Sequence, residues 1–334
     1  MVRVAVDGMG GDHAPRVVVE GAVNAAGEYG IEVILVGRQD LLEKELTKHK
    51  PVPSCLTVRH ASEVVDMAEP AAVTVRKKRN SSIVVAAELV KKNEADAVVS
   101  AGHTGAAVVA TTLTLGLLEG IERPGIAIAY PTLNGHSVII DIGANIDAKP
   151  EHLLQYAVMG STYASLILHK KEPRVGLLNI GEEESKGPDF MKETHKLIEE
   201  SRLNFVGNIE GRDIFSGKID VVVCDGFVGN IVLKVTESLA ESTNILLRRE
   251  LMSSVLSKMG ALLIKPTLSR LKKRLDYTEF GGAPLLGVNG SCIICHGGSS
   301  AKAIKNAIRV AGEFVTSQLN EKIQTILGKK GTYA

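Results

Sequence analysis

VRVAVDGMGGDHAP, residues 2–15, is the stretch that decides the fold of this chain. A β-branched apolar run stops at a turn that holds three glycines, and Pro15 follows, a residue favoured inside the first turn of a helix. Small and apolar residues then repeat at helical spacing: Val17, Val18, Gly21, Ala22 and Ala25. The pattern predicts a strand, a glycine-rich turn and a helix in direct succession.

The same order of strand, polar turn and helix recurs along the whole chain. The further turns follow the runs ADAVVS, SVIID, VGLLN, NFVGN, VVVC and SCIIC, at residues 101–106, 142–147, 180–187, 209–213, 225–230 and 296–300. Helical patterns recur at about 82–93, 104–118, 150–170, 188–202, 228–248 and 299–327. This alternation is typical of βαβ units. We therefore expect one α/β domain over residues 1–334, a three-layer αβα sandwich around a mostly parallel sheet.

Composition argues against several classes of protein. The formal net charge is +1, there is no Trp, and no basic stripe interleaves with aromatic residues, so we expect no nucleic-acid partner. No apolar run approaches the roughly 20 residues of a membrane-spanning helix, and the first apolar run is too short for a signal peptide, which predicts a cytoplasmic protein. Cys292 and Cys295 should point to opposite faces of a strand, which favours reduced core cysteines over a metal site.

Because parallel strands all end at one edge of their sheet, we expect the turns to meet in one crevice. In the first turn, Gly10 and Gly11 let the backbone approach a ligand, and Asp12 and His13 stand before a helix start that favours an anion. The turn lacks the third glycine of a dinucleotide fingerprint, so NAD is not indicated. The spacing from Gly211 to Lys218 likewise fails as a nucleotide-binding P-loop, and no cofactor is expected.

The other turns bring further polar residues to the same crevice: His103, Thr104, Gly105, Asn145, Asp147, Lys186, Asp225, Asn230, His296 and Ser299. Each has an ordinary alternative, since His13 and Thr104 also suit helix caps and a lone lysine is usually solvated. No nucleophile elbow or zinc-type His-Glu motif is present. Many donors without a recognisable nucleophile indicate an enzyme that handles a phosphate-like anion and receives its attacking group as a substrate.

One stretch, within residues 241–280, breaks the rhythm of strands and helices. Between residues 245 and 275 it carries a single acid, Glu250, against these basic residues: Arg248, Arg249, Lys258, Lys265, Arg270, Lys272, Lys273 and Arg274. We expect a protruding basic amphipathic helical segment. Its apolar residues would face a membrane surface or the partner in a dimer, and both readings stay open: Leu251, Val255, Leu256, Met259, Leu262 and Leu263.

Several blocks in register resemble the bacterial PlsX family of phosphate:acyl-acyl-carrier-protein acyltransferases. They are DGMGGDHAP, SAGHTGA, DIGANIDAKPEHLLQYAVMG, LLNIGEEESKG, NIEGRD, DGFVGNIVLK and CHGGSS, between residue 2 and about residue 315. The resemblance implies transfer of a fatty acyl group from acyl carrier protein to inorganic phosphate, giving acyl phosphate for phospholipid synthesis. It also implies a homodimer with a fold like the isocitrate and isopropylmalate dehydrogenases, held at the inner face of the cell membrane. A membrane glycerol-3-phosphate acyltransferase would then receive the product.

For this chemistry we expect the turn from Gly10 to His13, together with Lys186, to hold the phosphate. Thr104 and Asn145 would stabilise the tetrahedral oxyanion. The family pattern implies S-A-G-N-T-G around position 103, where this chain has His103, and the role of that position stays open. Three rival interpretations remain: a phosphate acyltransferase for short-chain acyl-CoA, a non-catalytic scaffold that binds acyl carrier protein at the membrane, and a decarboxylating NAD dehydrogenase suggested only by fold analogy.

Overall fold

The computed structural model describes residues 1–275 and 281–327, with side chains of residues 271–275 excepted. The strands are β1 (Arg3–Asp7), β2 (Glu32–Gly37), β3 (Leu56–His60), β4 (Ala97–Ser100), β5 (Gly125–Thr132), β6 (Gly135–Ile140), β7 (Val175–Leu178), β8 (Phe205–Ile209), β9 (Val221–Val223), β10 (Ala283–Leu286) and β11 (Ser291–Ile294). The helices are α1 (Arg16–Tyr29), α2 (Gln39–Leu46), α3 (Ala71–Lys77), α4 (Ser82–Lys91), α5 (Thr104–Leu115), α6 (Pro150–Leu166), α7 (Asp189–Glu199), α8 (Gly226–Leu251), α9 (Val255–Leu275), α10 (Ala301–Thr316) and α11 (Leu319–Leu327), with one 3-10 turn, η1 (Gly211–Asp213).

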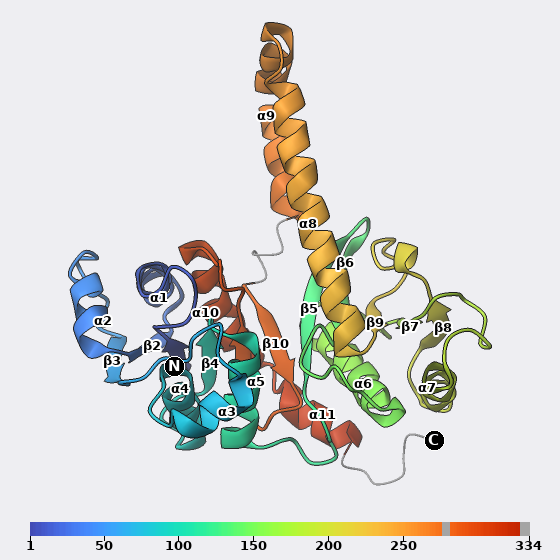
Figure 1. The fold of residues 1–334 in the computed structure, drawn as a ribbon, viewed down its shortest axis with the longest axis horizontal. Helices are drawn as coiled ribbons and strands as arrows, with labels where there is room; N and C mark the ends of the chain where they lie inside the picture. Colours follow the sequence, from blue (N-terminus) through green and yellow to red (C-terminus); the bar gives the residue numbers. More distant parts are fainter. Residues whose placement is uncertain (276–280, 328–334) are drawn as a thin grey trace.

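All the strands that the sequence pattern predicts are present, and they form one mixed sheet. Its order is β3-β2-β1-β4-β11-β10-β5-β6-β9-β7-β8 (Figure 1). Most neighbours pair in parallel, whereas β10 is antiparallel to both β11 and β5, and β5 is antiparallel to β6. The expected mostly parallel α/β sheet is therefore confirmed.

The expectation that all the turns share one edge of the sheet is wrong. The antiparallel pairs reverse the strand direction, so that β1, β4 and β11 end toward one edge and β6, β7, β8 and β9 toward the other. The two sets nevertheless come close at β10, which is only four residues long. Ala283, at its start, pairs with Ile294 at the end of β11, and Leu285 pairs with Ile126, whose carbonyl accepts a hydrogen bond from the Ile142 amide after β6.

Three antiparallel pairings produce this reversal. Two of them join consecutive strands through a short connection that contains an Asn-Gly pair, whereas β10 and β5 lie far apart in the sequence. Asn134 and Gly135 join β5 to β6, and Asn289 and Gly290 lie between β10 and β11. Asn-Gly is a strong short-range hairpin signal. Of these four residues only Gly135 has a positive φ, 102°. These connections were the sequence signal for two of the three antiparallel pairs.

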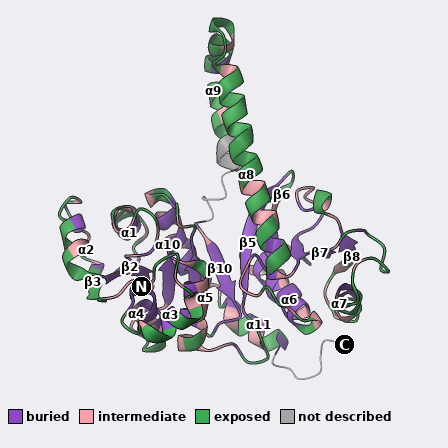
Figure 2. Ribbon diagram, viewed as in Figure 1, coloured by how far each residue is buried: buried purple, intermediate pink, exposed green. Residues whose placement is uncertain are grey.

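Two hydrophobic layers cover the sheet, one on each face. Val4 and Val6 of β1 point into the layer beneath α1, α6, α10 and α11, while Ala5 points into the layer beneath α4 and α5. This alternation follows from the period of two in a strand, and it makes the sheet the buried centre of the molecule (Figure 2). The three layers of the predicted sandwich are helices, sheet and helices.

The predicted helix over 299–327 is in fact two helices. Gln318 adopts a φ of 52°, which ends α10 and lets the chain turn into α11. The Asn320 side chain then donates to the carbonyls of Val288 and Gly290, at 3.2 and 2.9 Å, which anchors α11 below the β10–β11 connection. A periodicity of apolar residues cannot show such a break, because the pattern continues across it.

The helices α8 and α9 form an antiparallel hairpin that projects from the body of the molecule (Figure 1). The hairpin begins earlier than the sequence pattern suggests, since α8 starts at Gly226 and its first turns pack against the body. Residues 276–280 of the predicted segment, and the side chains of Lys272, Lys273 and Arg274, lie outside the described residues. Over the residues that are described, no helix is both long enough and apolar enough to cross a membrane.

Candidate active-site cleft

A cleft of about 290 Å³ lies where the two sets of strand ends meet. Its apolar floor is formed by Ile126 and Ile128 of β5, Ile142 after β6, Ile294 of β11 and Leu233 of α8. Polar residues line it as well: Thr104, Asn230, Lys234, Glu237, His296, Ser299 and Ser300. The cleft therefore joins turns from both halves of the sheet, although the strands of those halves run in opposite directions.

Lys234 and His296 are the most informative pair at this cleft. The Lys234 Nζ lies 3.4 Å from the His296 Nε2, although α8 and the turn after β11 are far apart in the sequence. The His296 Nδ1 accepts a hydrogen bond from the backbone N–H of Gly298 at 3.1 Å, so a neutral ring carries its proton on Nε2. Two donors then face each other beside the Glu237 carboxylate, which accepts from the Lys234 Nζ at 3.1 Å. Paired donors of this kind suit an anion.

The turns of the first half pack tightly against one another beside the cleft. The Asp12 amide donates to the Gly297 carbonyl at 2.9 Å, and a Cβ on Gly10 would lie 2.6 Å from the Gly102 nitrogen. Gly10 must therefore be glycine for the first turn to reach the second. Asp12 and His13 themselves are exposed and do not line the cleft.

Position 103 has a structural role that its residue type alone did not reveal. His103 is the N-cap of α5, and its Nδ1 accepts a hydrogen bond from the Ala106 amide at 3.2 Å. An asparagine at this position would offer an oxygen for the same bond, and Asn is among the preferred N-cap residues. The departure from the family pattern thus preserves the cap. The next residue, Thr104, is exposed and lines the cleft.

Two buried aspartates organise the turns in the two halves. Asp7, after β1, accepts a hydrogen bond from the Ser100 hydroxyl at 2.8 Å, and burial raises the pKa of its carboxyl. Asp141, after β6, accepts backbone N–H bonds at 2.7–3.0 Å from Ile126, Gly143, Ala144 and Asn145. Burial raises the pKa of Asp141 and those N–H bonds oppose the shift. Both carboxylates shape the loops around the cleft without lining it.

Several predicted site residues form hydrogen bonds within the protein instead of facing the cleft. The Asn145 amide Nδ2 lies 3.2 Å from the Tyr156 hydroxyl and 3.3 Å from the His152 Nδ1, so it points into the protein. Asp225 is the N-cap of α8, accepting from the amides of Phe227 and Val228 at 2.9 Å. Asp147 is exposed.

Lys186 lies on the exposed loop 180–187 after β7. Its Nζ is 3.9 Å from the Glu183 carboxylate of the same loop. It is not among the described residues that line the cleft, and neither is Gly105. The cleft thus brings together Thr104, Asn230, His296 and Ser299 from the predicted set and leaves Lys186 outside.

The two cysteines of the C-x-x-C pair lie on opposite faces of the sheet, as predicted. Cys292 belongs to one hydrophobic layer and Cys295 to the other. Burial raises the pKa of Cys292 to about 11 and that of Cys295 to about 12, so both thiols stay protonated near neutral pH. Although Cys295 lines the cleft, a protonated thiol is a weak nucleophile.

Lys234 is the residue that sequence reasoning missed. It lies in the block DGFVGNIVLK, but it stands two turns into a helix and not at a strand end, so the pattern of strand-end turns does not point to it. The available signal was its helical spacing: Asn230 and Lys234 are four residues apart and so share one face of α8. Because Asn230 is a candidate site residue, its position on the same helix face as Lys234 was the sequence signal for Lys234.

Comparisons with known proteins show the family and the fold of this chain. The family model described as fatty acid synthesis protein matches residues 2–322. A phosphate acyltransferase from Trichlorobacter lovleyi is 52% identical over 96% of this chain and 93% of its own, and one from Geotalea uraniireducens is 54% identical with the same coverage.

Two solved structures share the fold at low identity. A phosphotransacetylase from Streptococcus pyogenes superposes with a TM-score of 0.62 at 19% identity, covering 96% of this chain and 94% of that one. A 4-hydroxythreonine-4-phosphate dehydrogenase from Klebsiella pneumoniae gives 0.58 at 12% identity, covering 94% and 100%. The expected likeness to a dehydrogenase fold is therefore confirmed. The chain belongs to the fatty acid synthesis protein family and, within it, to the phosphate acyltransferases, which are transferases.

Proposed function

We propose that this chain transfers a fatty acyl group from an acyl-carrier-protein thioester to inorganic phosphate, giving acyl phosphate for phospholipid synthesis. A phosphate oxygen attacks the thioester carbonyl, the carbon–sulfur bond breaks, and the thiolate leaves and takes up a proton. A thiol with an ordinary pKa near about 8.5 leaves without a strong general acid. The protein's task is then to place the two substrates and to stabilise the oxyanion.

The observation that carries this proposal is the pairing of two facing donors with an apolar floor. Lys234 and His296 suit an anion such as phosphate, and the isoleucines beneath them suit the start of an acyl chain. Thr104, at the start of α5, and the buried Ser299, just before α10, also line the cleft and supply hydroxyls. We assign the phosphate to Lys234 and His296, and the thioester oxygen to the Thr104 and Ser299 side.

Lys186 and the turn from Gly10 to His13 remain our second candidates for the phosphate, with Asn145 for the oxyanion. The loop 180–187 is mostly exposed, and over the described part of the chain the Lys186 ammonium has one ion pair, the 3.9 Å contact with Glu183. Lys186→Ala should lower turnover without lowering the melting temperature. Turnover equal to the wild type would remove Lys186 from the site.

The direct test mixes protein, acyl-acyl-carrier protein and phosphate, and follows free thiol together with acyl groups trapped by hydroxylamine. We expect both signals to require phosphate and to rise in equal amounts. Thiol release without phosphate would instead indicate a thioesterase, and absence of release would indicate a binding scaffold. A short-chain acyl-CoA donor, run in parallel, distinguishes the closest alternative: it should react more slowly, because it leaves much of the apolar floor uncovered.

The projecting hairpin supports a peripheral site of action at the inner face of the membrane. Five of the predicted membrane-facing residues are exposed, namely Val255, Leu256, Met259, Leu262 and Leu263, whereas Leu251 is half-buried. Leu256 and Leu263 are 81% and 82% exposed, and Lys258 and Lys265 stand beside them. An exposed apolar surface with neighbouring cations suits anionic lipid. The acyl phosphate would then pass to a membrane glycerol-3-phosphate acyltransferase without crossing water.

A second exposed stripe lies nearer the body, and we assign it to the homodimer. Ile231, Val235 and Leu239 follow one another at helical spacing on α8 and are exposed. Val235→Glu should therefore shift the sedimentation coefficient toward the monomer, whereas Leu256→Glu at the tip should leave it unchanged. The opposite pattern would place the dimer contact at the tip and the lipid contact elsewhere.

A further inference from the structure

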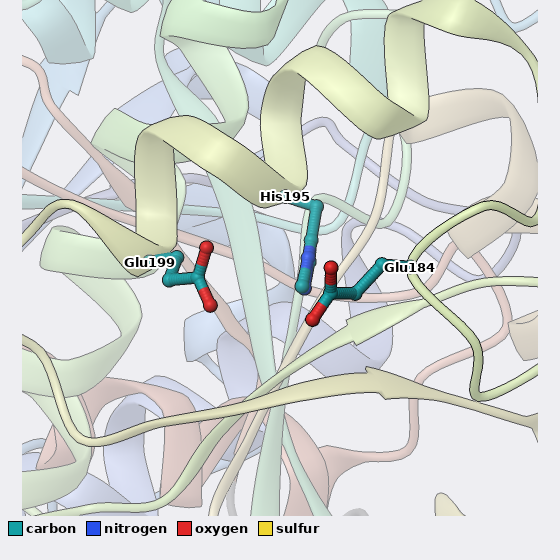
Figure 3. A group of neighbouring side chains, drawn as sticks. All are labelled: Glu184, His195 and Glu199. Atoms are coloured by element: carbon teal, nitrogen blue, oxygen red, sulfur yellow. The ribbon is translucent and has the colours of Figure 1, made fainter.

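We propose that Glu184, His195 and Glu199 form a binding site for a divalent transition-metal ion of the zinc class, separate from the cleft. One ligand atom from each of the three residues lies within 4.8 Å of the other two. Figure 3 shows the His195 ring between the two carboxylates, with Glu199 on the same helix and Glu184 reaching in from the loop before it. His195 and Glu199 are four residues apart on α7, which places them on one face.

His195 is the strongest evidence, because its Nε2 has no partner among the residues that the structure describes. The side chain is only 6% exposed, and this Nε2 is buried without a hydrogen bond to any of them. The ring is held edge-on against Phe205, with 5.0 Å between the ring centres. A buried polar atom without a partner carries a desolvation cost, and such an atom calls for an explanation. A metal ion accepts the lone pair of the Nε2 and removes that cost.

The two carboxylates supply the complementary charge. Neither Glu184 nor Glu199 forms an ion pair within the described part of the chain, although the neighbouring Glu182, Glu183 and Glu200 all do. Two carboxylates beside one imidazole would repel each other without a cation between them. A dication neutralises both.

The donor set selects the class of ion. Imidazole favours zinc and neighbouring transition metals, whereas magnesium and calcium prefer oxygen donors alone. Bonds of about 2 Å to zinc place ligand atoms roughly 3 to 4 Å apart, so the side chains need to move inward only slightly. Glu184 and Glu199 are exposed and have the freedom to do so. Water completes the coordination.

The site joins α7 to the loop that carries Lys186. Glu184 lies two residues before Lys186, and the Glu183 carbonyl already accepts a hydrogen bond from the Asn208 side chain at 3.0 Å. A bound ion would add a second fixed point and hold the loop against α7. Binding of the ion would therefore make loop 180–187 more rigid. This effect is distinct from acyl transfer.

The test is isothermal titration of the full chain with zinc chloride, after treatment with a chelator, with no acyl substrate present. We expect one zinc ion per chain from this site, and at least tenfold weaker binding in Glu184→Gln/Glu199→Gln. The matched control is Glu193→Gln/Glu200→Gln, which removes the same charge from exposed positions on or beside α7 and should bind zinc like the wild type.

A second readout separates ligation from folding. Zinc should raise the melting temperature of the wild type and of the control variant, and should leave that of Glu184→Gln/Glu199→Gln unchanged. Equal zinc affinity in all three proteins, or loss of binding in the control as well, would overturn the proposal. Because no acyl transfer is measured, failure here would leave the proposed reaction untouched.

Discussion

The α/β body and the α8–α9 hairpin use apolar side chains in opposite ways. In the body they alternate along each strand and are buried in two layers, so that polar residues gather where strands end. In the hairpin they are exposed along most of the length (Figure 2). The body therefore collects polar side chains in one place, as a reaction site requires. The hairpin instead exposes apolar side chains, as contact with another apolar surface requires.

One helix belongs to both regions. The first turns of α8, residues 226–237, are called its root here, and they hold Asn230, Lys234 and Glu237 at the cleft. The same helix continues outward to Leu251, toward the tip of the hairpin. Buried Gly226 and Gly229 fix its root against the loop after β6. The root of α8 therefore sets the position of Lys234, while the tip of the hairpin is free to make other contacts.

The largest effect should come from adding a side-chain carbon at the root of α8, where the helix contacts the loop after β6. A Cβ on Gly229 would lie 1.9 Å from the Asp141 carbonyl oxygen, so Gly229→Ala must displace α8. We expect a loss of about 3 kcal/mol or more of the free energy of unfolding, since overpacking a close contact costs roughly 1–3 kcal/mol and at times more. Chemical denaturation measures it.

The matched control is at the other end of the hairpin. A Cβ on Gly260 meets no atom within 4 Å, so Gly260→Ala should hold or slightly raise stability, because alanine is favoured over glycine inside a helix. Equal destabilisation by both substitutions would contradict the tight root.

The next largest effect concerns catalysis at the root. Lys234→Met should lower kcat/KM for phosphate about ten- to a hundredfold, because a hydrogen bond to a charged group contributes about 1.5–3 kcal/mol. Lys258→Met, an exposed lysine on α9, should leave it unchanged when acyl-carrier protein is supplied in solution. Steady-state rates of thiol release at varied phosphate concentration give kcat/KM for both variants. Equal values for Lys234→Met and Lys258→Met would show that the cleft does not bind the phosphate.

A smaller effect should appear at the tip. Leu256→Ser/Leu263→Ser removes two exposed leucines, and burying one such side chain contributes roughly 1.5–3 kcal/mol. Vesicles with anionic lipid should bind this variant at least about tenfold more weakly than the wild type. Turnover in solution should be unchanged. If the variant sediments with vesicles as the wild type does, the tip is not the lipid contact.

The smallest effect belongs to the cap of α5. His103→Asn keeps an acceptor for the Ala106 amide and should change the free energy of unfolding by less than about 0.5 kcal/mol, whereas His103→Ala should cost about 1 kcal/mol. Thermal or chemical denaturation of the three proteins measures this. A loss in His103→Asn as large as that in His103→Ala would show that the imidazole does more than cap the helix.

Much of the body could be predicted from its residues. Strands and turns follow from β-branched runs that stop at glycines, and the opposite faces of Cys292 and Cys295 follow from the period of a strand. The direction of the strands did not follow from those runs. Two of the three antiparallel pairs follow the Asn-Gly connections at Asn134 and Asn289, whereas the pairing of β10 with β5 joins strands that are far apart in the sequence.

The site was harder to predict than the fold. Polar residues at strand ends were recognisable, and Thr104, Asn230, His296 and Ser299 do line the cleft. Whether a side chain faces a ligand or a neighbouring bond depends on tertiary contacts: Asn145 turns inward to Tyr156, and Asp225 caps α8. Lys234 reaches the cleft only because α8 crosses the turn after β11.

The most direct test of the central claim is a double-mutant cycle on Lys234→Met and His296→Ala. If both donors hold one phosphate, their effects on kcat/KM for phosphate should be strongly coupled. We predict that the double variant loses at most about tenfold beyond the worse single variant, as expected of residues that act as a unit. Losses that simply multiply would contradict a shared phosphate site at the root of α8.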